Sequence, residues 1–373
     1  MYKRQAFISP FFPLKGGIAR FSGLLANALR DQRGDEVVPI AFRALFPDFI
    51  AKGAEAPLPE EFRLKLFNPF SWPETIQRLR SLKPDILLVS YWTGFLAPLF
   101  FVVRRLTRIK MVVLLHNLFS HESFFFESFL QRLLAASVDG VLTLSCAVSQ
   151  EVKAAMPDIP QLTLFHPIYE PDGEIPSVQE ARRALKLDAH VPVLLFFGYV
   201  RHYKGLDIML RAMPAILQKE PALRLVVAGH FYEDLSRYRR LIDKLGISGS
   251  VDLSPGYVSA ERSALYFASA DAVVLPYRSA TQSGVVQLAY GYGLPVIVTP
   301  EGALPEMVRP GRTGWVARDS SPEGFADAVG EFLESRDKLP LMRPAIEAFR
   351  HEFSWEAFAA SAGRFLETIA AGR

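Results

Sequence analysis

The chain has little cysteine, no long uncharged apolar run and no large excess of either charge. Cys146 is the single cysteine in 373 residues, which excludes an internal disulfide and a cysteine-rich zinc site and is typical of a reducing compartment. No stretch reaches the roughly 18–20 uncharged apolar residues of a membrane span. The amino terminus lacks the apolar segment of a signal peptide. We therefore expect a cytoplasmic protein, either soluble or peripheral at the inner face of the membrane.

The balance of charges is equally restrained. Lys and Arg number 42 against 39 Asp and Glu, giving a formal net charge of +3, with a pI near 8.9. This excess is too small to indicate a nucleic-acid partner, although it suits anionic ligands or lipid headgroups. With 50% hydrophobic residues, a chain of this length is expected to form two domains with sizeable cores.

Short apolar runs separated by helical segments recur along the chain, which is typical of an α/β protein with parallel sheets buried on both faces. In the first half, Gly16 and Gly17 permit a tight turn before a predicted helix at Ile18–Arg30. The predicted strands are Ala6–Ser9, Val37–Phe42, Ile86–Ser90, Met111–Leu115, Val141–Leu144, Leu162–Phe165, Val193–Phe197, Leu225–Ala228, Val251–Leu253, Ala272–Leu275 and Pro295–Thr299.

The polar, Pro- and Gly-rich segment Glu170–Ser177 separates two such series. We predict two doubly wound Rossmann-like domains facing each other across a cleft, covering residues 1–172 and 173–353.

Two cations follow the strand Val193–Phe197. Arg201 and Lys204 come after Gly198 and before a predicted helix. Ligands of open α/β sheets bind at the carboxyl ends of the strands, and a helix amino terminus favours an anion there. Thr281, Gln282, Ser283 and Gly284 stand in a similar place after the strand Ala272–Leu275. The alternative is an ordinary loop that happens to carry a surface Arg and Lys.

Polar side chains also follow the strand Met111–Leu115: His116, Asn117, His121 and Glu122. Their position at a sheet edge favours a functional role, although hydrogen-bonded structural histidines remain an alternative.

The region around this strand could also meet a membrane. Four basic residues interrupt the apolar segment 96–115: Arg104, Arg105, Arg108 and Lys110. Phe124, Phe125 and Phe126 cannot all face one core, because neighbours on a helix point about 100° apart. We infer a membrane-docking face here; burial in the core or in an acceptor groove is the alternative.

The order and spacing of several motifs resemble the GT-B glycosyltransferases of family 4. The motifs are G-G-I-A-R-F, H-N-L-F-S-H-E, F-G-Y-V-R-H-Y-K-G-L-D, S-A-D-A-V-V-L-P-Y, T-Q-S-G-V, G-L-P-V-I-V-T and G-A-L-P-E-M-V. The resemblance covers nearly the whole chain. It implies an acceptor-binding first domain, a metal-free second domain that binds a nucleotide-sugar donor as substrate without any cofactor, and a closing helix near Ser354–Leu366 that returns to the first domain.

The same resemblance implies roles for individual residues. Arg201 and Lys204 would hold the donor diphosphate and act catalytically, Ser283 and Gly284 would lie beside it, and Glu306 would be near the nucleotide. From their positions in the sequence, and not from the resemblance, we predict further donor contacts at Gly17, Gln282 and Gln287. The place of His116 at the end of a strand predicts a catalytic role on the acceptor side, with Gly16, Asn117, His121 and Glu122 as further acceptor-side residues.

The sequence departs from the family pattern at its paired glutamates. Counted back from G-L-P-V, these positions hold Ala280 and Leu288, with Gln282 and Gln287 as nearby polar substitutes. The departure leaves the donor sugar and retention of anomeric configuration open. We favour a subgroup marked by T-Q-S-G-V over an inactive protein.

The leading hypothesis is transfer of a sugar from a nucleotide-diphosphate donor to a hydroxyl acceptor, carbohydrate or lipid-linked, in cell-surface polysaccharide or glycolipid synthesis. The chain lacks a D-x-D pair beside a strand end, so no metal is expected. Two alternatives stay open: another GT-B enzyme, such as a sugar-nucleotide epimerase or phosphorylase, and a non-catalytic sugar-nucleotide-binding subunit.

Overall fold

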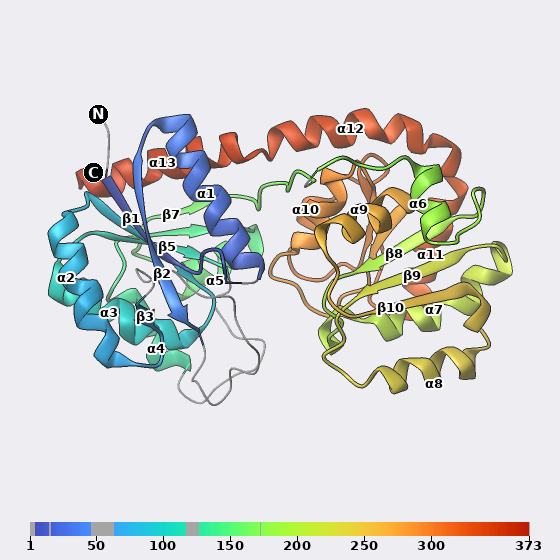
Figure 1. Ribbon diagram of the computed structural model, residues 1–373, viewed down its shortest axis with the longest axis horizontal. Coiled ribbons are helices and arrows are strands. Elements are labelled where there is room, and N and C mark those ends of the chain that lie inside the picture. Colours follow the sequence, from blue (N-terminus) through green and yellow to red (C-terminus); the bar gives the residue numbers. More distant parts are fainter. Residues whose placement is uncertain (1–3, 15, 46–62, 117–126, 172, 373) are drawn as a thin grey trace. The chain divides into compact units, whose positions relative to one another are not determined.

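The computed structural model describes residues 4–14, 16–45, 63–116, 127–171 and 173–372 (Figure 1). The chain divides into two compact units. Unit 1 comprises Met1–Phe165 and Ser354–Arg373, and unit 2 comprises His166–Phe353.

Unit 1 is built on a seven-stranded parallel sheet with the order β3-β2-β1-β4-β5-β6-β7. Its strands are β1 Arg4–Ser9, β2 Glu36–Ala44, β3 Leu64–Lys65, β4 Ile86–Tyr91, β5 Met111–Leu115, β6 Gly140–Thr143 and β7 Gln161–Thr163. Its helices are α1 Gly17–Arg33, α2 Trp72–Leu82, α3 Ala97–Thr107, α4 Glu127–Ala135, α5 Cys146–Ala155 and α13 Trp355–Ala371, with short 3-10 turns η1 Pro69–Ser71 and η2 Gly94–Leu96.

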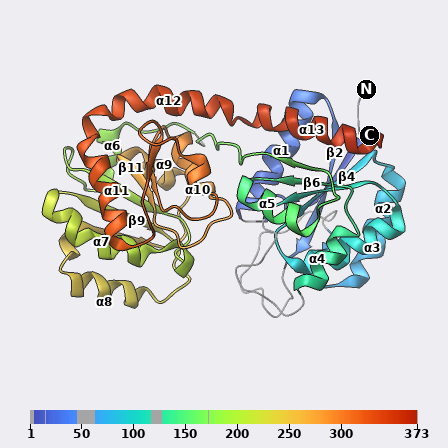
Figure 2. The same ribbon diagram turned by 180° about the vertical axis from the view of Figure 1, so that it is seen from behind.

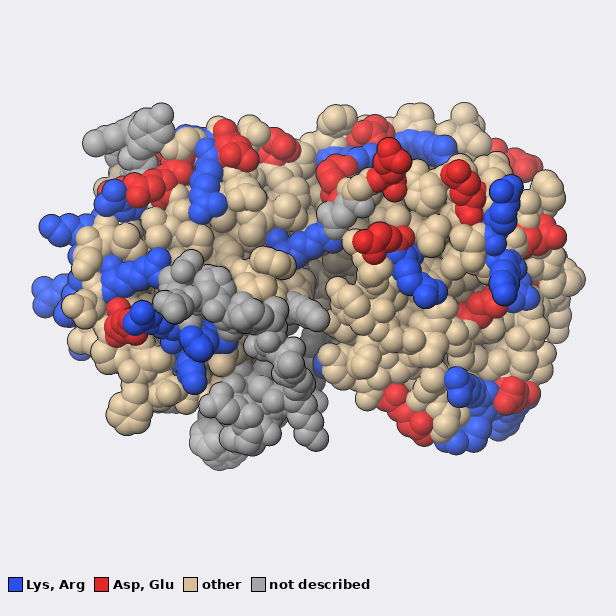
Figure 3. Space-filling model, viewed as in Figure 1, with Lys and Arg blue, Asp and Glu red and all other residues tan. Residues whose placement is uncertain are grey.

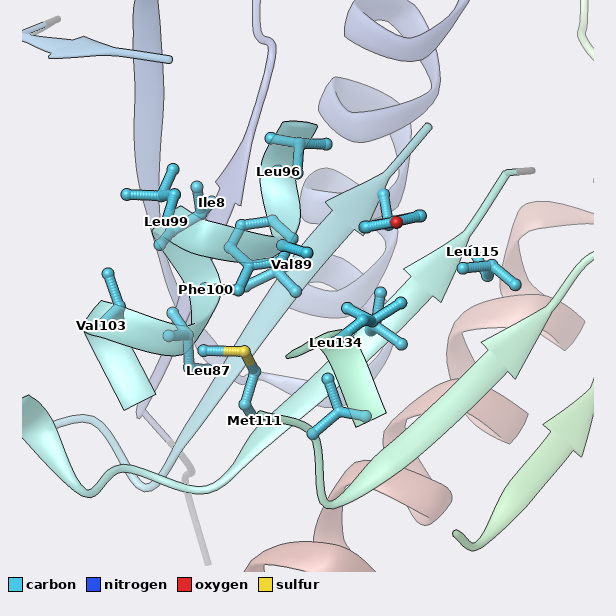
Figure 4. Packing of buried hydrophobic residues seen from close by; sticks show 14 of the residues in the cluster. Ile8, Leu87, Val89, Leu96, Leu99, Phe100, Val103, Met111, Leu115 and Leu134 are labelled. Atoms are coloured by element: carbon cyan, nitrogen blue, oxygen red, sulfur yellow. The ribbon is translucent and has the colours of Figure 1, made fainter. Parts of the chain in front are cut away.

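Side chains from successive positions of these strands enter two different cores, as the pleat requires. Leu87 and Val89 of β4 pack with α3, as Figure 4 shows for Phe100 and Val103, whereas Leu88 packs toward α1 and α13. Strands buried on both faces must be apolar throughout, which explains why short continuous apolar runs predicted them.

Unit 2 is built on a six-stranded parallel sheet with the order β10-β9-β8-β11-β12-β13. Its strands are β8 Val193–Phe197, β9 Arg224–Gly229, β10 Val251–Pro255, β11 Ala272–Leu275, β12 Val296–Val298 and β13 Gly314–Val316. Its helices are α6 Val178–Ala184, α7 Leu206–Lys219, α8 Leu235–Leu245, α9 Ala260–Ser269, α10 Gly284–Gly291, α11 Pro322–Glu334 and α12 Leu339–Glu352, with 3-10 turns η3 His202–Lys204, η4 Ser248–Ser250, η5 Pro305–Met307 and η6 Arg336–Lys338. Helix α7 packs against α11, and α6 packs against α9 (Figures 1 and 2).

The predicted α/β class with two doubly wound sheets is confirmed. Three predicted strands, β5, β8 and β11, have the observed bounds. The two strands that were not predicted, β3 and β13, are only two and three residues long and lie at the ends of their sheets. Such short edge strands lack the apolar run that marks the central ones.

The division between the units falls after Phe165, ahead of the boundary predicted after residue 172. The segment that begins at His166 packs within unit 2: the Ile168 amide donates to the Phe353 carbonyl oxygen at 2.9 Å. A Cβ added to Gly291 in α10 would lie 2.0 Å from the Tyr169 carbonyl oxygen, which shows how closely the segment follows that helix.

Candidate functional site

The carboxyl edge of the unit 2 sheet brings together the loops that follow β8 and β11. The connections from β8 run outward on one side through β9 and β10, and those from β11 run outward on the other through β12 and β13. Ligands of doubly wound sheets bind at this reversal of strand order. The neighbouring strands β8 and β11 therefore place Arg201 and Lys204 beside the segment 276–283.

The turn after β8 depends on close backbone contacts. Gly205, which precedes α7, has a φ of +63°, and a Cβ there would lie 1.9 Å from the carbonyl oxygen of Pro276. A side chain is therefore excluded by both strain and contact. This glycine allows η3, which contains Lys204, to lie directly against the loop after β11.

Arg201 is the exposed cation of the site. Its guanidinium carbon lies over the ring of Tyr232, 4.1 Å from the centroid. Within the described parts of the chain, no carboxylate lies at ion-pair distance from it. Its charge is thus held on an aromatic face and is not neutralised by an acid.

Lys204 is the buried cation, with only 9% of its surface exposed. Its ammonium nitrogen lies 5.2 Å from the ring centroid of Tyr277. Gly198 lies between Lys204 and the first turn of α10: a Cβ added to this glycine would be 3.6 Å from the ammonium nitrogen and 3.7 Å from Val285 Cγ2. Burial lowers the pKa of Lys204, and the nearby charge of Arg201 lowers it further. Two adjacent cations, one of them desolvated, indicate a site that gains from binding an anion.

The amino terminus of α10 lies near Lys204 and has no side-chain cap of its own. Ser283, at the N-cap position, makes no side-chain cap hydrogen bond, and the first turn contains no acidic residue. The Ser283 hydroxyl instead lies 3.5 Å from the hydroxyl of Tyr277. Free backbone N–H groups and the helix dipole therefore add to the positive potential near Lys204.

An ion pair fixes the loop after β11 on the loop after β8. Nη1 and Nη2 of Arg278 donate to the Asp207 carboxylate, at 2.8 and 2.7 Å. Nη1 also donates to the His202 carbonyl oxygen at 2.9 Å. Burial raises the pKa of Asp207, but the hydrogen bonds and charge of Arg278 outweigh it, so this pKa lies below its usual value. The pair holds the two site loops in register.

The other predicted donor contacts are distributed unevenly around this edge. Gln282 is half-buried and Gly284 is exposed at the start of α10. Gln287, on the same helix, is only 1% exposed, and its Oε1 accepts no hydrogen bond in the described part of the chain. Gln287 is therefore covered and does not reach a ligand in this conformation. Glu306 lies half-buried in η5, in the loop after β12.

The two positions that depart from the family pattern differ in their surroundings. Ala280 is buried, and its carbonyl oxygen accepts from the Ala303 amide at 3.0 Å. A Cβ on Gly302 would lie 1.8 Å from the same oxygen, so the loops after β11 and β12 are in close contact here. Leu288 is half-buried on α10.

In unit 1, His116 follows β5 and is 3% exposed. Its amide donates to the Tyr91 carbonyl oxygen at 2.9 Å, and its ring packs edge-on against Phe21 of α1, with centroids 5.3 Å apart. Gly16 and Gly17 are exposed at the start of α1. Three predicted acceptor-side residues lie outside the described residues: Asn117, His121 and Glu122.

Sequence reasoning missed four residues of the site: Asp207, Tyr232, Tyr277 and Arg278. Tyr277 and Arg278 stand directly after a predicted strand, and Tyr232 follows another by a few residues. Their proximity to strand ends was a usable signal, but it did not indicate which partners they meet.

The described residues contain no group of three or more His, Cys, Asp or Glu side chains that could hold a metal ion. In the same ranges, none of the helices combines the length and apolar character needed to cross a membrane.

Two doubly wound units, one with a cationic site at its strand-order reversal, define the GT-B class of α/β proteins. Residues 15–167 match the family model Glycosyltransferase Family 4, and residues 191–335 match the model Glycosyl transferases group 1. The chain therefore belongs to the glycosyltransferases, with a family 4 domain followed by a group 1 domain.

Related proteins agree with this assignment. The chain is 34% identical to D-inositol 3-phosphate glycosyltransferase of Streptomyces griseus over 200 residues, which are 51% of this chain and 42% of that protein. It thus spans less than half the length of the Streptomyces relatives that it matches. The enzyme of the same name from Corynebacterium glutamicum is 25% identical over 361 residues, 90% of this chain and 84% of that protein.

Solved structures share the fold at low sequence identity. Sucrose-phosphate synthase from Thermosynechococcus elongatus has a TM-score of 0.75 at 19% identity and covers all of both chains. Anabaena Alr3699/HepE in complex with UDP has a TM-score of 0.74 at 17% identity, covering 98% of this chain and all of the other.

Proposed function

We propose that this protein transfers a sugar from a nucleotide-diphosphate donor to a hydroxyl acceptor, carbohydrate or lipid-linked, in cell-surface polysaccharide or glycolipid synthesis. The observation that carries the proposal is the pair Arg201 and Lys204, which lies beside the uncapped start of α10 and lacks a carboxylate partner in the described residues. A diphosphate supplies the charge that this site lacks.

The two cations have a direct part in the proposed reaction. As the bond between the sugar C1 and the diphosphate oxygen breaks, negative charge grows on the leaving diphosphate. The acceptor oxygen bonds to C1, and its proton passes to the leaving diphosphate oxygen. Fixed positive charges stabilise such a transition state most when they are partly desolvated, as Lys204 is. The two cations neutralise the charge that a divalent ion would otherwise neutralise, so the proposed transfer needs no metal. We also propose that the transfer retains the anomeric configuration of the sugar.

Relatives and structural neighbours support the donor class. Anabaena HepE has been solved with UDP and with UDP-glucose, and the curated relatives are named as glycosyltransferases. In unit 1 we place the acceptor side near the end of β5 and the start of α1, where His116 and Gly16 lie.

The test is a transfer assay with a panel of nucleotide sugars and hydroxyl acceptors, with and without EDTA. Arg201→Ala and Lys204→Ala should each lower kcat/KM by roughly 10- to 100-fold, because a hydrogen bond to a charged group contributes about 1.5–3 kcal/mol. Arg211→Ala, which removes an exposed arginine of α7, is the control and should leave kcat/KM unchanged. EDTA should have no effect.

Other results would point elsewhere. Unchanged kinetics in both folded site variants would remove the proposed diphosphate site, and activity restored by Mg²⁺ after EDTA would overturn the role given to the cations. Donor turnover without an acceptor would favour an epimerase or phosphorylase. Donor binding without any turnover would favour a binding subunit.

A further inference from the structure

Both cations of the donor site rest on tyrosine rings. The Arg201 guanidinium carbon lies 4.1 Å from the centroid of Tyr232, and the Lys204 ammonium nitrogen lies 5.2 Å from the centroid of Tyr277. By contrast, two other arginines of unit 2 each bind a carboxylate: Arg224 binds Asp252, and Arg278, in the loop after β11, binds Asp207. The two cations of the site thus have a different kind of partner from these neighbours.

An aromatic partner and a carboxylate partner differ in their effect on a phosphate ligand. The ring face attracts a cation through its quadrupole and carries no net charge. A carboxylate would neutralise the cation and compete with the phosphate oxygens for the same N–H donors. A ring can therefore orient an arginine and leave its charge available to the ligand.

Backbone pairing places Tyr232 under Arg201. The parallel alignment of β8 and β9 continues beyond both strands as a bridge between Val200 and Phe231. The Val200 amide donates to the His230 carbonyl oxygen at 2.8 Å, and the Tyr232 amide donates to the Val200 carbonyl oxygen at 3.1 Å. Arg201 and Tyr232 thereby occupy adjacent positions at the carboxyl edge of the sheet.

Neighbouring rings fix the orientation of the Tyr232 ring. Tyr199 and His230 meet it edge-on, with centroids 5.3 and 4.9 Å away. Arg201 itself is exposed, and a free arginine side chain loses rotamer entropy when a ligand orders it. Because the Tyr232 ring already holds the guanidinium in place, less side-chain entropy is lost when the ligand binds.

We propose that Tyr232 is a positioning residue that holds Arg201 ready for the donor diphosphate. This inference rests on the proposed function and deepens it, because it assigns the affinity for the diphosphate partly to a side chain that does not touch it. The aromatic ring of Tyr232, and not its hydroxyl group, positions the Arg201 guanidinium.

The experiment measures binding of UDP, ADP and GDP to the full chain by calorimetry. Tyr232→Leu should weaken binding of the preferred nucleotide about fivefold, the effect of a cation–aromatic contact at an exposed site. Tyr232→Phe should bind within about twofold of the wild type, because it keeps the ring. Tyr232→Glu should bind more weakly than Tyr232→Leu, because its carboxylate competes with the phosphate.

A double-mutant cycle separates positioning from a general loss of structure. In an Arg201→Ala background, Tyr232→Leu should have no further effect on affinity. Arg262→Ala is the matched control, since it removes another contact of unit 2 between an arginine and a tyrosine ring, the one with Tyr266 at 5.7 Å, and should leave nucleotide binding unchanged.

Two failures are distinguishable. If the wild type binds none of the nucleoside diphosphates, the proposed function fails and this inference fails with it. If the wild type binds one of them and the Leu and Glu variants of Tyr232 bind it as tightly as the wild type does, the inference alone is overturned. The same holds if Tyr232→Leu still weakens binding in the Arg201→Ala background.

Discussion

At the scale of single residues, burial changes the protonation of two groups in unit 2 in the same direction. The pKa of Lys204, in the proposed donor site, is lowered, and so is the pKa of His166, where the chain enters unit 2. The His166 ring is buried, its Nδ1 lies 2.8 Å from the Pro167 carbonyl oxygen, and its Nε2 lies 3.3 Å from the Tyr169 hydroxyl.

The buried imidazole of His166 predicts a loss of stability in acid. Burial lowers the pKa of His166 to about 4, whereas the unfolded chain has the ordinary value of about 6.5. Between these pH values the unfolded state binds a proton that the native state does not, so stability falls as the pH drops, by about 3 kcal/mol in total. Urea unfolding between pH 7 and pH 4 measures this slope. His166→Gln should show a shallower slope, and an unchanged slope would contradict the assignment.

At the scale of elements, the site depends on how the loops after β8 and β11 are joined. Asp207 lies in the first turn of α7, and Arg278 follows β11. Their bidentate pair, with Asp207 mostly buried, is better placed to stabilise than the exposed pairs on the surface. Loss of this pair should therefore affect both the stability of the protein and the proposed diphosphate site.

We predict that Asp207→Asn lowers the free energy of unfolding by about 1.5–3 kcal/mol at neutral pH. The folded pKa of Asp207 is lowered, so the stabilisation is present above the unfolded pKa and is lost as the pH falls through the folded one. The difference from the wild type should shrink in acid. Asp327→Asn, which breaks an exposed pair with Arg318, should cost less than about 1 kcal/mol. Equal effects of the two substitutions in denaturant unfolding would contradict this account.

At the scale of the whole molecule, the question is whether unit 1 meets a membrane. Lys and Arg side chains are interspersed with Asp and Glu on the face shown in Figure 3. Of the four cations singled out in the sequence, Arg104 pairs with Asp139 at 3.0 Å, and Lys110 donates to the Ile369 carbonyl oxygen at 2.8 Å. Arg105 and Arg108 remain exposed. Phe124, Phe125 and Phe126 lie outside the described residues.

The proposed membrane-docking face therefore rests on fewer cations than the sequence suggested. Three apolar side chains of this region are exposed: Phe95 in η2 and Leu106 in α3 are each about half exposed, and Phe129 in α4 is 63% exposed. Each basic residue near anionic headgroups contributes about 1 kcal/mol, so replacing Arg105 and Arg108 with Ala should weaken binding to anionic vesicles roughly 30-fold. Replacing Arg211 and Arg318 of unit 2 is the control. Wild-type protein that stays in the supernatant during cosedimentation at low salt would contradict the docking proposal.

The sequence by itself determined the central strands, their parallel arrangement and the position of two cations of the proposed site. Central strands of a doubly wound sheet are buried on both faces, so each appears as a short apolar run, and β5, β8 and β11 were predicted with their observed bounds. Arg201 and Lys204 could be found because they lie in the loop that follows such a run. These features depend on neighbours in the chain.

Only the tertiary structure decided which loops meet. Arg278 and Asp207 are 71 residues apart, and Lys204 is buried because β8 and β11 are neighbours in the sheet. The same packing turned Gln287 to the buried side of α10 and placed Tyr232 under Arg201. Local periodicity encodes the elements, but strand order and side-chain packing decide which distant residues touch, and no spacing within one segment carries that information.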